Sequence, residues 1–489
     1  MKKALRLVLM LMLIFTVALS TACSKEETTE PEEKNAVEYT SGDYRYIRLS
    51  RKAAMITDYT GSPFDVNLSI PDKLDGYRVT AIGDNVFSRC EIWSVSIPDG
   101  VISIGNGAFK DCYVLDKISI PDSVTSIGNN AFEGCIDLKR ISIPNSVTSI
   151  GDNAFEGCTY LERISIPNSV TTIGMNPFAG CLSLNRISVS SDHPVFATIG
   201  GVLINKSEKK LVSYPCAFTE ASYAIPNDIT VIGDGAFSNC SSLKSVSIPN
   251  SVIAIGDSAF SRCEFLTSIS IPKGVTSIGS NAFSGCWRLT SITLLDSVTS
   301  IGDSAFYNCS ALDSIFIPNS VTTMGSNPFV NCAARGSITV SPDHPVFAII
   351  DGVLINKSEK KLVSYPSAST ETSYSIPDDI TVIGGGAFYN CRNLKSISIP
   401  NSVTSICDSA FNGCEYLTRV SIPNGVTSIG ELAFFECSRL TSVYIPDSVI
   451  SIGDNAFSNC PNNILTVGRD SYAETWCQQR RKKYTYAKN

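Results

Sequence analysis

Cysteine and histidine are the residue types in this 489-residue chain whose side chains most readily perform chemistry or bind metals. The chain has 18 cysteines and two histidines. A structural zinc site needs four convergent ligands, usually supplied in close pairs such as C-x-x-C, and the sequence contains no such pair. Two imidazoles also leave little material for acid–base chemistry. We therefore expect no metal and no cofactor.

The two histidines, His193 and His344, lie in matching local sequences. Each follows an aspartate and precedes a proline, a composition that favours a turn. As catalytic or metal-binding residues they would lack partners. The sequence also has no G-x-S-x-G elbow, no phosphate-binding P-loop and no paired-carboxylate signature outside a repeating context. We predict that the protein is not an enzyme; an enzyme would need the segments around the two histidines to assemble a catalytic cluster together.

The spacing of the cysteines is the main signal in the sequence. Fourteen of them recur with a step of 23 residues, interrupted once by a step of 22 and twice by a step of 59. A constant period of this length is typical of a repeat protein. The fourteen are Cys90, Cys112, Cys135, Cys158, Cys181, Cys240, Cys263, Cys286, Cys309, Cys332, Cys391, Cys414, Cys437 and Cys460.

A representative unit runs from Cys135 to Phe155 and reads C-x-x-L-x-x-I-x-I-P-N-S-V-x-x-I-G-x-x-A-F. Its apolar positions do not fit a helix, but they match a coil whose inward side chains stack on those of the next coil. We expect a short strand from Leu138 to Ile143 that pairs in parallel with its equivalents, and Pro144 ends it because proline cannot donate to the ladder. The predicted core positions are Leu138, Ile141, Ile143, Val147, Ile150, Ala154 and Phe155.

A glycine follows the second isoleucine in thirteen of fourteen units, as at Gly83, Gly105 and Gly128. Glycine is the residue expected where the chain must turn with positive φ, so we predict positive φ at this position. The exception is Cys407. If the prediction is right, the backbone of Cys407 is strained.

The cysteine column could in principle form disulfides, because stacked coils bring equivalent Cα atoms to about 5 Å. The columns between the long steps contain five, five and four cysteines, so pairing of neighbours leaves two unmatched. Side chains in register also point in parallel instead of toward each other. We therefore expect small buried thiols that behave as apolar side chains.

The repeat pattern resembles a known family. L-x-x-I-x-I within 23 residues resembles the leucine-rich repeat, and the fuller string I-P-[ND]-x-V-x-x-I-G-x-x-A-F-x-x-C is similar to the BspA-type subclass of bacterial surface proteins over residues 81–463. The resemblance implies a repeat solenoid with parallel β-strands and about fourteen 23-residue coils. One departure is that Ser146 stands where the usual leucine-rich repeat has a ladder asparagine. At about 4.8 Å per strand we expect a single rod of about 65 Å.

The ends of the array need caps, because the first and last coils would otherwise expose an apolar cross-section and open strand edges. Residues 37–80 resemble the entry segment of the same subclass, with a hairpin-like start, and we expect an N-terminal β cap there. Residues 464–489 include S-Y-A-E-T-W from Ser471 onward, which is similar to the subclass's terminal helix. We predict a short C-terminal helical cap.

Two inserts explain the long steps. Each adds 36 residues, at 190–225 and 341–376, and the two are near copies placed 151 residues apart. Both carry D-H-P-V-F-A and then G-V-L-I-N-K-S-E-K-K-L-V-S-Y-P, whose apolar runs around K-S-E-K predict a β-hairpin. Each follows a unit whose Ala-Phe has become Pro177-Phe178 or Pro328-Phe329. Duplication of a five-coil block with its insert is the simplest account.

The N-terminus reads as an export signal. Three basic residues precede an apolar run, Leu7 to Leu19, that is too short to span a bilayer. The run ends in L-S-T-A-C, which resembles the lipobox of bacterial lipoproteins, although Ser20 takes the usual leucine position. We expect residues 1–22 to be removed, Cys23 to be lipidated and residues 23–36 to form a disordered spacer. Ordinary cleavage after Ala22 would instead give a secreted protein.

Two outward columns of the predicted strands are candidate binding sites. The column between the paired isoleucines is mostly serine and is interrupted by Phe316 and Tyr444, which could anchor a partner or pack against a neighbouring coil. The column just before the first isoleucine is basic in the first block and serine in the second. It could bind an acidic protein or glycan, or simply be a solvated face. We name its four residues the basic stripe: Lys117, Arg140, Arg163 and Arg186.

Composition limits the function. A content of 43% hydrophobic residues excludes a disordered chain, and a formal net charge of −7 disfavours nucleic acid as a partner. Arg480 to Lys483 could touch an anionic surface, but four charges near a terminus usually face water. We expect a monomeric, lipid-anchored protein that binds extracellular protein or glycan, and the resemblance implies adhesion. The alternative is a scaffolding protein that binds the cell's own wall or partner proteins.

Overall fold

The computed structural model describes residues 37–64, 66–332, 338–461 and 464–487. The expected signal segment, Cys23 and the spacer lie outside these residues. Within the described part of the chain, no helix is both long enough and apolar enough to cross a membrane. The repeats form a solenoid of parallel strands, as the sequence predicts.

Each regular coil carries two short strands, where the sequence predicts one. The first follows C-x-x-L, as in β9 (Lys117–Ser119), and the second is the Ser-Ile pair before the glycine, as in β10 (Ser126–Ile127). Equivalent strands of successive coils pair in parallel and in register, so that Ser126 pairs with Ser103 and Ser149. In the coil of Cys135 the first position is reduced to a bridge between Arg140 and Arg163. Two parallel sheets, named the first sheet and the second sheet, therefore run along the array.

The two sheets are interrupted at the inserts, which divide the array into three stacks. The first sheet consists of β4 (Asn67–Ser69), β7 (Ser94–Ser96), β9, β12 (Arg163–Ile166) and β14 (Arg186–Val189), then β18 (Ser222–Ala224), β20 (Ser245–Ser247), β22 (Ser268–Ser270), β24 (Ser291–Thr293), β26 (Ile315–Ile317) and β28 (Ile338–Val340), then β32 (Ser373–Ser375), β34 (Ser396–Ser398), β36 (Arg419–Ser421), β38 (Ser442–Tyr444), β40 (Ile464–Val467) and β41 (Tyr484–Tyr486). The second sheet consists of β8 (Ser103–Ile104), β10, β11 (Ser149–Ile150) and β13 (Thr172–Ile173), then β19 (Val231–Ile232), β21 (Ala254–Ile255), β23 (Ser277–Ile278), β25 (Ser300–Ile301) and β27 (Thr323–Met324), then β33 (Val382–Ile383), β35 (Ser405–Ile406), β37 (Ser428–Ile429) and β39 (Ser451–Ile452).

The core lies between the sheets and the turn that carries Ala-Phe. All seven predicted core positions of the Cys135 unit are buried. The phenylalanines form a stacked column, and the rings of Phe109 and Phe132 lie 5.5 Å apart with an interplanar angle of 1°. The same stacking recurs in the second stack, where Phe283 and Phe306 lie 5.5 Å apart. Each coil is thus buried chiefly by its two neighbours.

The glycine column has a different cause from the predicted one. Among the column glycines, Gly105 and Gly128 do not have positive φ, so the prediction of a left-handed turn is wrong. A Cβ at Gly128 would instead lie 2.7 Å from the backbone carbon of Gly105. Real Cβ atoms do not approach a neighbour that closely. Glycine is needed because successive coils approach each other closely at this point.

Cys407 occupies the column without positive φ, and the coil before it explains how. In most coils the residue after the glycine is Asp, Asn or Ser, and a Cβ in the next coil would meet it; at Gly430, for example, a Cβ would lie 2.4 Å from Oδ1 of Asp408. In the coil before Cys407 this residue is Gly385. The missing side chain removes one of the close contacts that a Cβ makes in this column, whereas the contacts with the backbone of the preceding coil remain.

Side-chain ladders link the coils beside the backbone sheets. The backbone N–H of Asn129 donates to Oδ1 of Asn106 at 2.9 Å, and the backbone N–H of Asp152 donates to Oδ1 of Asn129 at 2.8 Å. Ser146, which stands where an asparagine would fall, donates its hydroxyl to the carbonyl of Val124 at 2.7 Å. Each ladder bond joins one coil to the preceding coil. Serine therefore takes over the linking role after the first strand.

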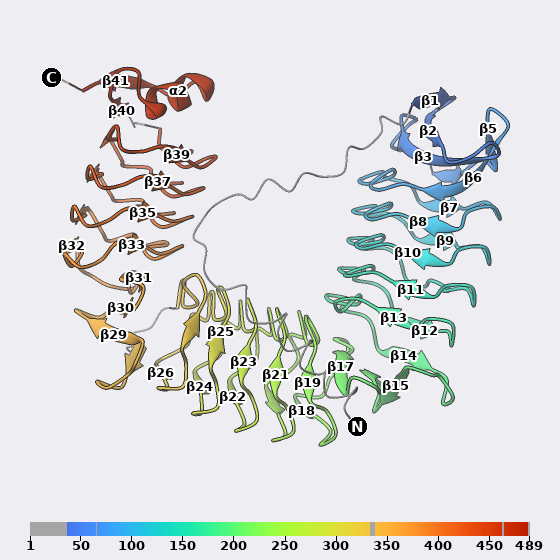
Figure 1. Ribbon diagram of the computed structural model, residues 1–489. Coiled ribbons are helices and arrows are strands. Elements are labelled where there is room, and N and C mark those ends of the chain that lie inside the picture. Colours follow the sequence, from blue (N-terminus) through green and yellow to red (C-terminus); the bar gives the residue numbers. More distant parts are fainter. Residues whose placement is uncertain (1–36, 65, 333–337, 462–463, 488–489) are drawn as a thin grey trace, which may run out of the picture.

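The inserts lie between stacks and bend the array. In the first, β15 (Phe196–Ile199), β16 (Val202–Asn205) and β17 (Lys210–Ser213) are antiparallel, and β17 then pairs in parallel with β19. The second repeats this arrangement with β29 (Phe347–Ile350), β30 (Val353–Asn356) and β31 (Lys361–Ser364). The predicted hairpins are confirmed with an added strand. Figure 1 shows that the stacks meet at bends beside the inserts, so the array is an open arc where the sequence predicts a rod.

Each insert contributes to two cores. Leu203 packs in the hydrophobic cluster of the first stack, whereas its neighbours Val202 and Ile204 pack in that of the second. Because alternate residues of a strand point to opposite faces, β16 is buried on both sides. The insert therefore acts as a shared layer that ends one stack and starts the next.

An asparagine closes each junction between stacks. Asn176, which is 2% exposed, donates its side-chain amide to the carbonyl of Gly235 at 2.7 Å and accepts the N–H of Phe178 at 3.0 Å. Asn327 makes the equivalent bond to Gly386 at 2.7 Å. The proline that follows each asparagine has no N–H for the coil ladder. At Asn-Pro-Phe the asparagine side chain therefore links the last coil of one stack to a residue of the next stack that lies 59 positions later in the sequence.

The two ends carry the predicted caps. At the N-terminus β1 (Glu38–Ser41), β2 (Tyr44–Arg48) and β3 (Ala53–Tyr59) form an antiparallel sheet that passes through β6 (Tyr77–Ile82), with β5 (Lys73–Leu74) at its side, into the second sheet. At the C-terminus α2 (Tyr472–Gln479) begins at Ser471, whose side chain accepts the N–H of Glu474. Trp476 covers Phe457, the last ring of its column, with centroids 6.1 Å apart.

The glycine explanation predicts a coupled pair of substitutions. Gly385→Asp should restore the usual side chain against the Cβ of Cys407 and lower the free energy of unfolding by about 1–3 kcal/mol, the typical effect of overpacking. The double variant Gly385→Asp/Cys407→Gly rebuilds the ordinary arrangement and should recover most of that loss in urea unfolding. Additive destabilisation in the double variant would contradict the explanation.

Candidate functional site

The cysteine column is part of the packing. Most of these thiols donate to the phenylalanine carbonyl of the preceding coil, as from Cys112 to Phe87 at 3.0 Å and from Cys135 to Phe109 at 3.2 Å. The same bond recurs along the array, for example from Cys309 to Phe283 at 3.1 Å. A thiol fills a small apolar site and still offers a weak donor, which valine or alanine cannot do. The expected role as buried small side chains holds for most of the column.

Burial also makes these thiols chemically inert. It raises the pKa of Cys112 to about 12, and it raises the pKa of Cys135 well above its usual value. The thiolate is the nucleophile and metal ligand, so a thiol held protonated at neutral pH performs neither function. Cys460, the last of the column, differs, because its hydrogen bond with Cys437 lowers its pKa.

One member of the column is bridged, contrary to expectation. Cys240 forms a disulfide with Cys216, which lies in the first insert and outside the 23-residue spacing. The insert brings Cys216 against the first coil of the second stack, a contact that a column of parallel side chains cannot supply. At the second junction the equivalent residues are Ser367 and Cys391, so the bridge is specific to the first.

The two histidines hold the inserts in place. The ring of His193 is fully buried, its Nδ1 accepts the N–H groups of Val195 and Phe196 at 3.1 Å, and its Nε2 lies 3.1 Å from the carbonyl of Pro167. This pattern fixes the neutral tautomer with the proton on Nε2. Burial lowers the pKa of His193, so the stability that it contributes is present above the usual histidine pKa and is lost as the pH falls below it. His344 repeats these contacts with Pro318.

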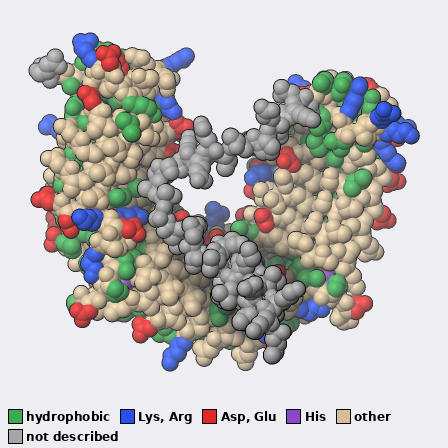
Figure 2. Space-filling model, viewed as in Figure 1, with side chains coloured by type: hydrophobic (Ala, Val, Ile, Leu, Met, Phe, Trp, Pro, Cys, Tyr) green, Lys and Arg blue, Asp and Glu red, His purple; other side chains and the backbone are tan. Residues whose placement is uncertain are grey.

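No group of three or more His, Cys, Asp or Glu side chains gathers in a metal-binding arrangement among the described residues. The charged side chains are spread along the array. On the face shown in Figure 2 they are scattered over a surface made mostly of backbone and of side chains that are neither charged nor hydrophobic. The surface is therefore extended and repetitive.

The basic stripe lies on the exposed face of the first sheet in the first stack. Its four side chains are exposed, and Arg163 pairs in register with Arg186 between β12 and β14. Arg140 lies 3.7 Å from a carboxylate oxygen of Glu162. Within the described chain, Arg163 and Arg186 have no ion-pair partner. The structure brings these four predicted residues together in one line.

Phe316 and Tyr444 are placed apart from the stripe and from each other. Phe316 is 50% exposed on β26, where it pairs in register with Thr339. Tyr444 is 37% exposed on β38, between Ser421 and Thr466. Each points outward from its sheet, in the second and third stack respectively. They are separate exposed aromatics and do not form one site with the stripe.

Sequence reasoning missed a row of exposed apolar side chains beside the stripe. They occupy the two variable positions of C-x-x-L, in the turn just before the first sheet. An apolar residue at one of these positions in each of four successive coils is the sequence feature that could have predicted the row. Backbone bonds link the turns, as from the N–H of Tyr160 to the carbonyl of Ile136 at 3.1 Å. Trp93 lies just before β7, and the centroid of its ring is 4.5 Å from the ammonium of Lys117. We name this row the turn ridge: Tyr113, Ile136, Tyr160 and Leu182.

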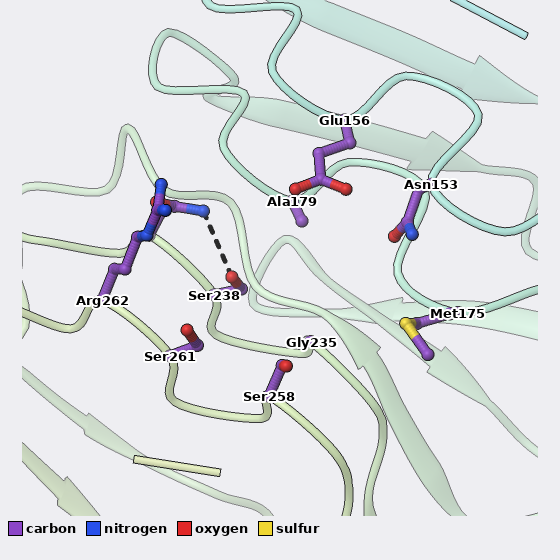
Figure 3. Close-up of a pocket in the computed structure, with 10 residues that line it drawn as sticks. Asn153, Glu156, Met175, Ala179, Gly235, Ser238, Ser258, Ser261 and Arg262 are labelled. Carbon is purple, nitrogen blue, oxygen red and sulfur yellow. Dashed lines mark hydrogen bonds between the residues drawn. The ribbon is translucent and has the colours of Figure 1, made fainter. Parts of the chain in front are cut away.

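A polar pocket of about 230 Å³ lies at the first junction, where the last coils of the first stack meet the first coils of the second (Figure 3). Glu156 and Asn153 line it from one stack, and Arg262 and Ser258 line it from the other. Burial, followed by the carboxylate of Glu133, raises the pKa of Glu156. This pocket brings different residue types together at a single place, whereas the repeated faces present the same residue types in every coil.

Comparison with known proteins supports the family resemblance that the repeat pattern indicates. The family model described as the BspA type leucine rich repeat region matches in six copies, at residues 80–199, 213–335 and 365–473. A leucine-rich repeat protein from Bacteroides ovatus ATCC 8483 is 26% identical, covering 92% of this chain and 100% of that one, with a TM-score of 0.40. A leucine rich cell surface protein from Faecalibacterium prausnitzii A2-165 is 28% identical, covering 90% and 96%, with a TM-score of 0.39. No curated protein sequence matches the chain.

The cysteine environment predicts a labelling order. In the folded protein at neutral pH, iodoacetamide should modify the half-buried Cys407 and Cys460 first and leave the buried column thiols unmodified, because their protonated sulfurs are inaccessible. Mass spectrometry of peptides from native and from unfolded protein measures this order, and a reductant should be needed to expose Cys216 and Cys240. Rapid native labelling of Cys286 or Cys309 would show that the column is not buried.

Proposed function

The chain belongs to the BspA-type leucine-rich repeat family, and from this premise we propose that it is a non-enzymatic bacterial surface protein that binds acidic extracellular protein or glycan through the exposed first sheet of its first stack. The observation that carries the proposal is the line of four basic side chains on a rigid sheet, bordered by the turn ridge. Lipidation of Cys23 would anchor the body, with residues 24–36 as the tether.

The stripe concentrates positive charge in one column of the first sheet. Stacked strands lie about 4.8 Å apart, and like charges at about 5 Å oppose each other by about 1 kcal/mol per pair in water. Glu162 lies 3.7 Å from Arg140, so part of this repulsion is offset. An acidic partner would relieve the remainder. Arginine also binds carboxylate and sulfate groups through two parallel hydrogen bonds.

The turn ridge adds apolar contact area beside the charges. Tyr113, Tyr160 and Leu182 are each nearly half exposed. Aromatic side chains at the centre of an interface supply a large share of binding energy, and arginine is enriched with them. A face that combines both suits an acidic protein, or a glycan whose rings stack on tyrosine. The stripe alone would bind polyanions with little selectivity.

The second stack offers a natural comparison, because the same column there is Ser245, Ser268, Ser291 and Ser314. Serine at these positions is therefore compatible with the fold. The third stack has a lone basic residue in the column, Arg419. The C-terminal basic run is engaged differently, since Arg480 pairs with Asp454 and Lys482 lies 3.4 Å from the carbonyl of Phe457. These contacts favour a packing role for the C-terminal run.

The proposal predicts the effect of removing the stripe. The variant Arg140→Ser/Arg163→Ser/Arg186→Ser should bind heparin and acidic matrix protein at least tenfold more weakly at low salt, because three charged contacts to sulfate or carboxylate groups are lost. Surface plasmon resonance measures this binding. Its melting temperature should stay near that of the parent chain. Arg419→Ser is the matched control and should leave binding unchanged. Equal binding by the triple variant would refute a role for the stripe.

Surface display has its own test. Protease treatment of intact cells should release fragments of the array, and Cys23→Ala should move the protein from the membrane fraction to the medium, because the lipid would be lost. Protection of the array on intact cells would instead favour the scaffolding alternative, in which the protein engages the cell's own envelope. Unchanged membrane association of the variant would contradict lipid anchoring at this residue.

A further inference from the structure

We propose that the pocket at the first junction is a binding site for a short zwitterion, a free amino acid or dipeptide, with Glu156 receiving the ammonium group and Arg262 the carboxylate. The site is separate from the basic stripe, which lies on the first sheet. It is formed where the turns before the cysteines of the two stacks face each other. The proposal goes beyond attachment to a surface, because it assigns a small-molecule site to the protein.

The lining is polar and comes from both stacks. Figure 3 shows Glu156 and Asn153 on one side of the space and Arg262, Ser258 and Ser261 on the other. The volume, about 230 Å³, suits a molecule of amino-acid size. Most of these side chains offer hydrogen-bond donors or acceptors. None of the described residues that line the pocket is aromatic, so among them there is no stacking surface of the kind that a sugar would use.

The two charged side chains are available to a ligand. In the preceding coil Glu133 forms a salt bridge with Lys110 at 2.8 Å. Glu156, the next carboxylate in that column, forms no salt bridge with a described residue. Among the residues that the structure describes, neither the carboxylate of Glu156 nor the guanidinium of Arg262 has a hydrogen-bond or ion-pair partner. Their charges still interact across the pocket. A ligand that carries both opposite charges would pair with each of them at once.

The walls of the pocket are held by fixed contacts. Asn176 links the first stack to Gly235, which itself lines the pocket. The disulfide between Cys216 and Cys240 ties the insert to the same coil of the second stack. Such links reduce the ordering that ligand binding would require. The pocket is therefore preorganised by the junction and not by the ligand.

The duplicated second junction shows that the fold does not require an open pocket here. At the positions 151 residues later, Tyr307 replaces Glu156, Tyr389 replaces Ser238 and Gly413 replaces Arg262. The rings of Tyr307 and Tyr389 lie 6.1 Å apart, edge to face, across that junction. The same backbone arrangement is thus compatible with a filled, uncharged junction. The first junction differs by having space and two opposite charges together.

The chain supplies its own filled control for a binding test. Calorimetric titration of the full mature protein with glycine, the other common amino acids and glycylglycine should detect binding of at least one zwitterion, whereas acetate, methylamine and glucose should bind at least tenfold more weakly. Glu156→Gln and Arg262→Gln should each weaken the zwitterion by about tenfold or more, since each removes a charged hydrogen bond. Glu156→Tyr/Ser238→Tyr introduces the two tyrosines of the second junction and should abolish binding while keeping the melting temperature.

Three results would overturn the proposal. The first is the absence of binding by every zwitterion at millimolar concentration. The second is undiminished binding by the tyrosine-filled variant, which would place the ligand elsewhere. The third is preferential binding of glucose, which would replace the ligand class. Arg140→Ser, a change in the stripe, should leave zwitterion binding unaltered, so failure of this proposal and failure of surface adhesion are distinguishable.

Discussion

The close approach of successive coils is the constraint on which the rest of the structure depends. A Cβ at Gly128 would lie 2.7 Å from the backbone of the preceding coil, and the rings of Phe109 and Phe132 stack at 5.5 Å. A coil of 23 residues has no core of its own, so its burial comes from the coils above and below. Glycine, the small thiol and the serine and asparagine ladders are all consequences of that spacing. The caps are needed because the first and last coils each lack a neighbouring coil on one side.

Much of this could be predicted from the period alone. The recurrence of Cys, Leu, Ile and Phe defines the coil, and residues such as Leu138 and Phe155 are buried as expected. The reason for the glycine column could not be predicted from the sequence, because a positive φ and a close approach of two coils both favour glycine. Cys407 distinguishes them, but only through its relation to Gly385 in the preceding coil. The second strand was missed because two residues, as in Ser149–Ile150, carry no alternation of their own.

The junctions were the least predictable parts, and they are where the array stops repeating. Cys216 lies outside the cysteine period, so its bond to Cys240 depends on how the insert folds back. Glu156 and Arg262 come from coils separated by an insert, and no short motif relates them. The stripe, in contrast, follows from one column of the repeat. A regular array supplies extended faces, and a break in the array supplies the place where unlike residues meet.

Hydrogen–deuterium exchange of the insert strands tests most directly whether mutual burial runs unbroken through the molecule. Because β16 and β17 share side chains with the cores of two stacks, their amides should be protected to the same degree as those of the flanking strands β13 and β19. The regular coils and the inserts would then behave as one continuous layered body. Rapid exchange of Val202–Asn205 and Lys210–Ser213, comparable to that of an exposed loop, would contradict the account.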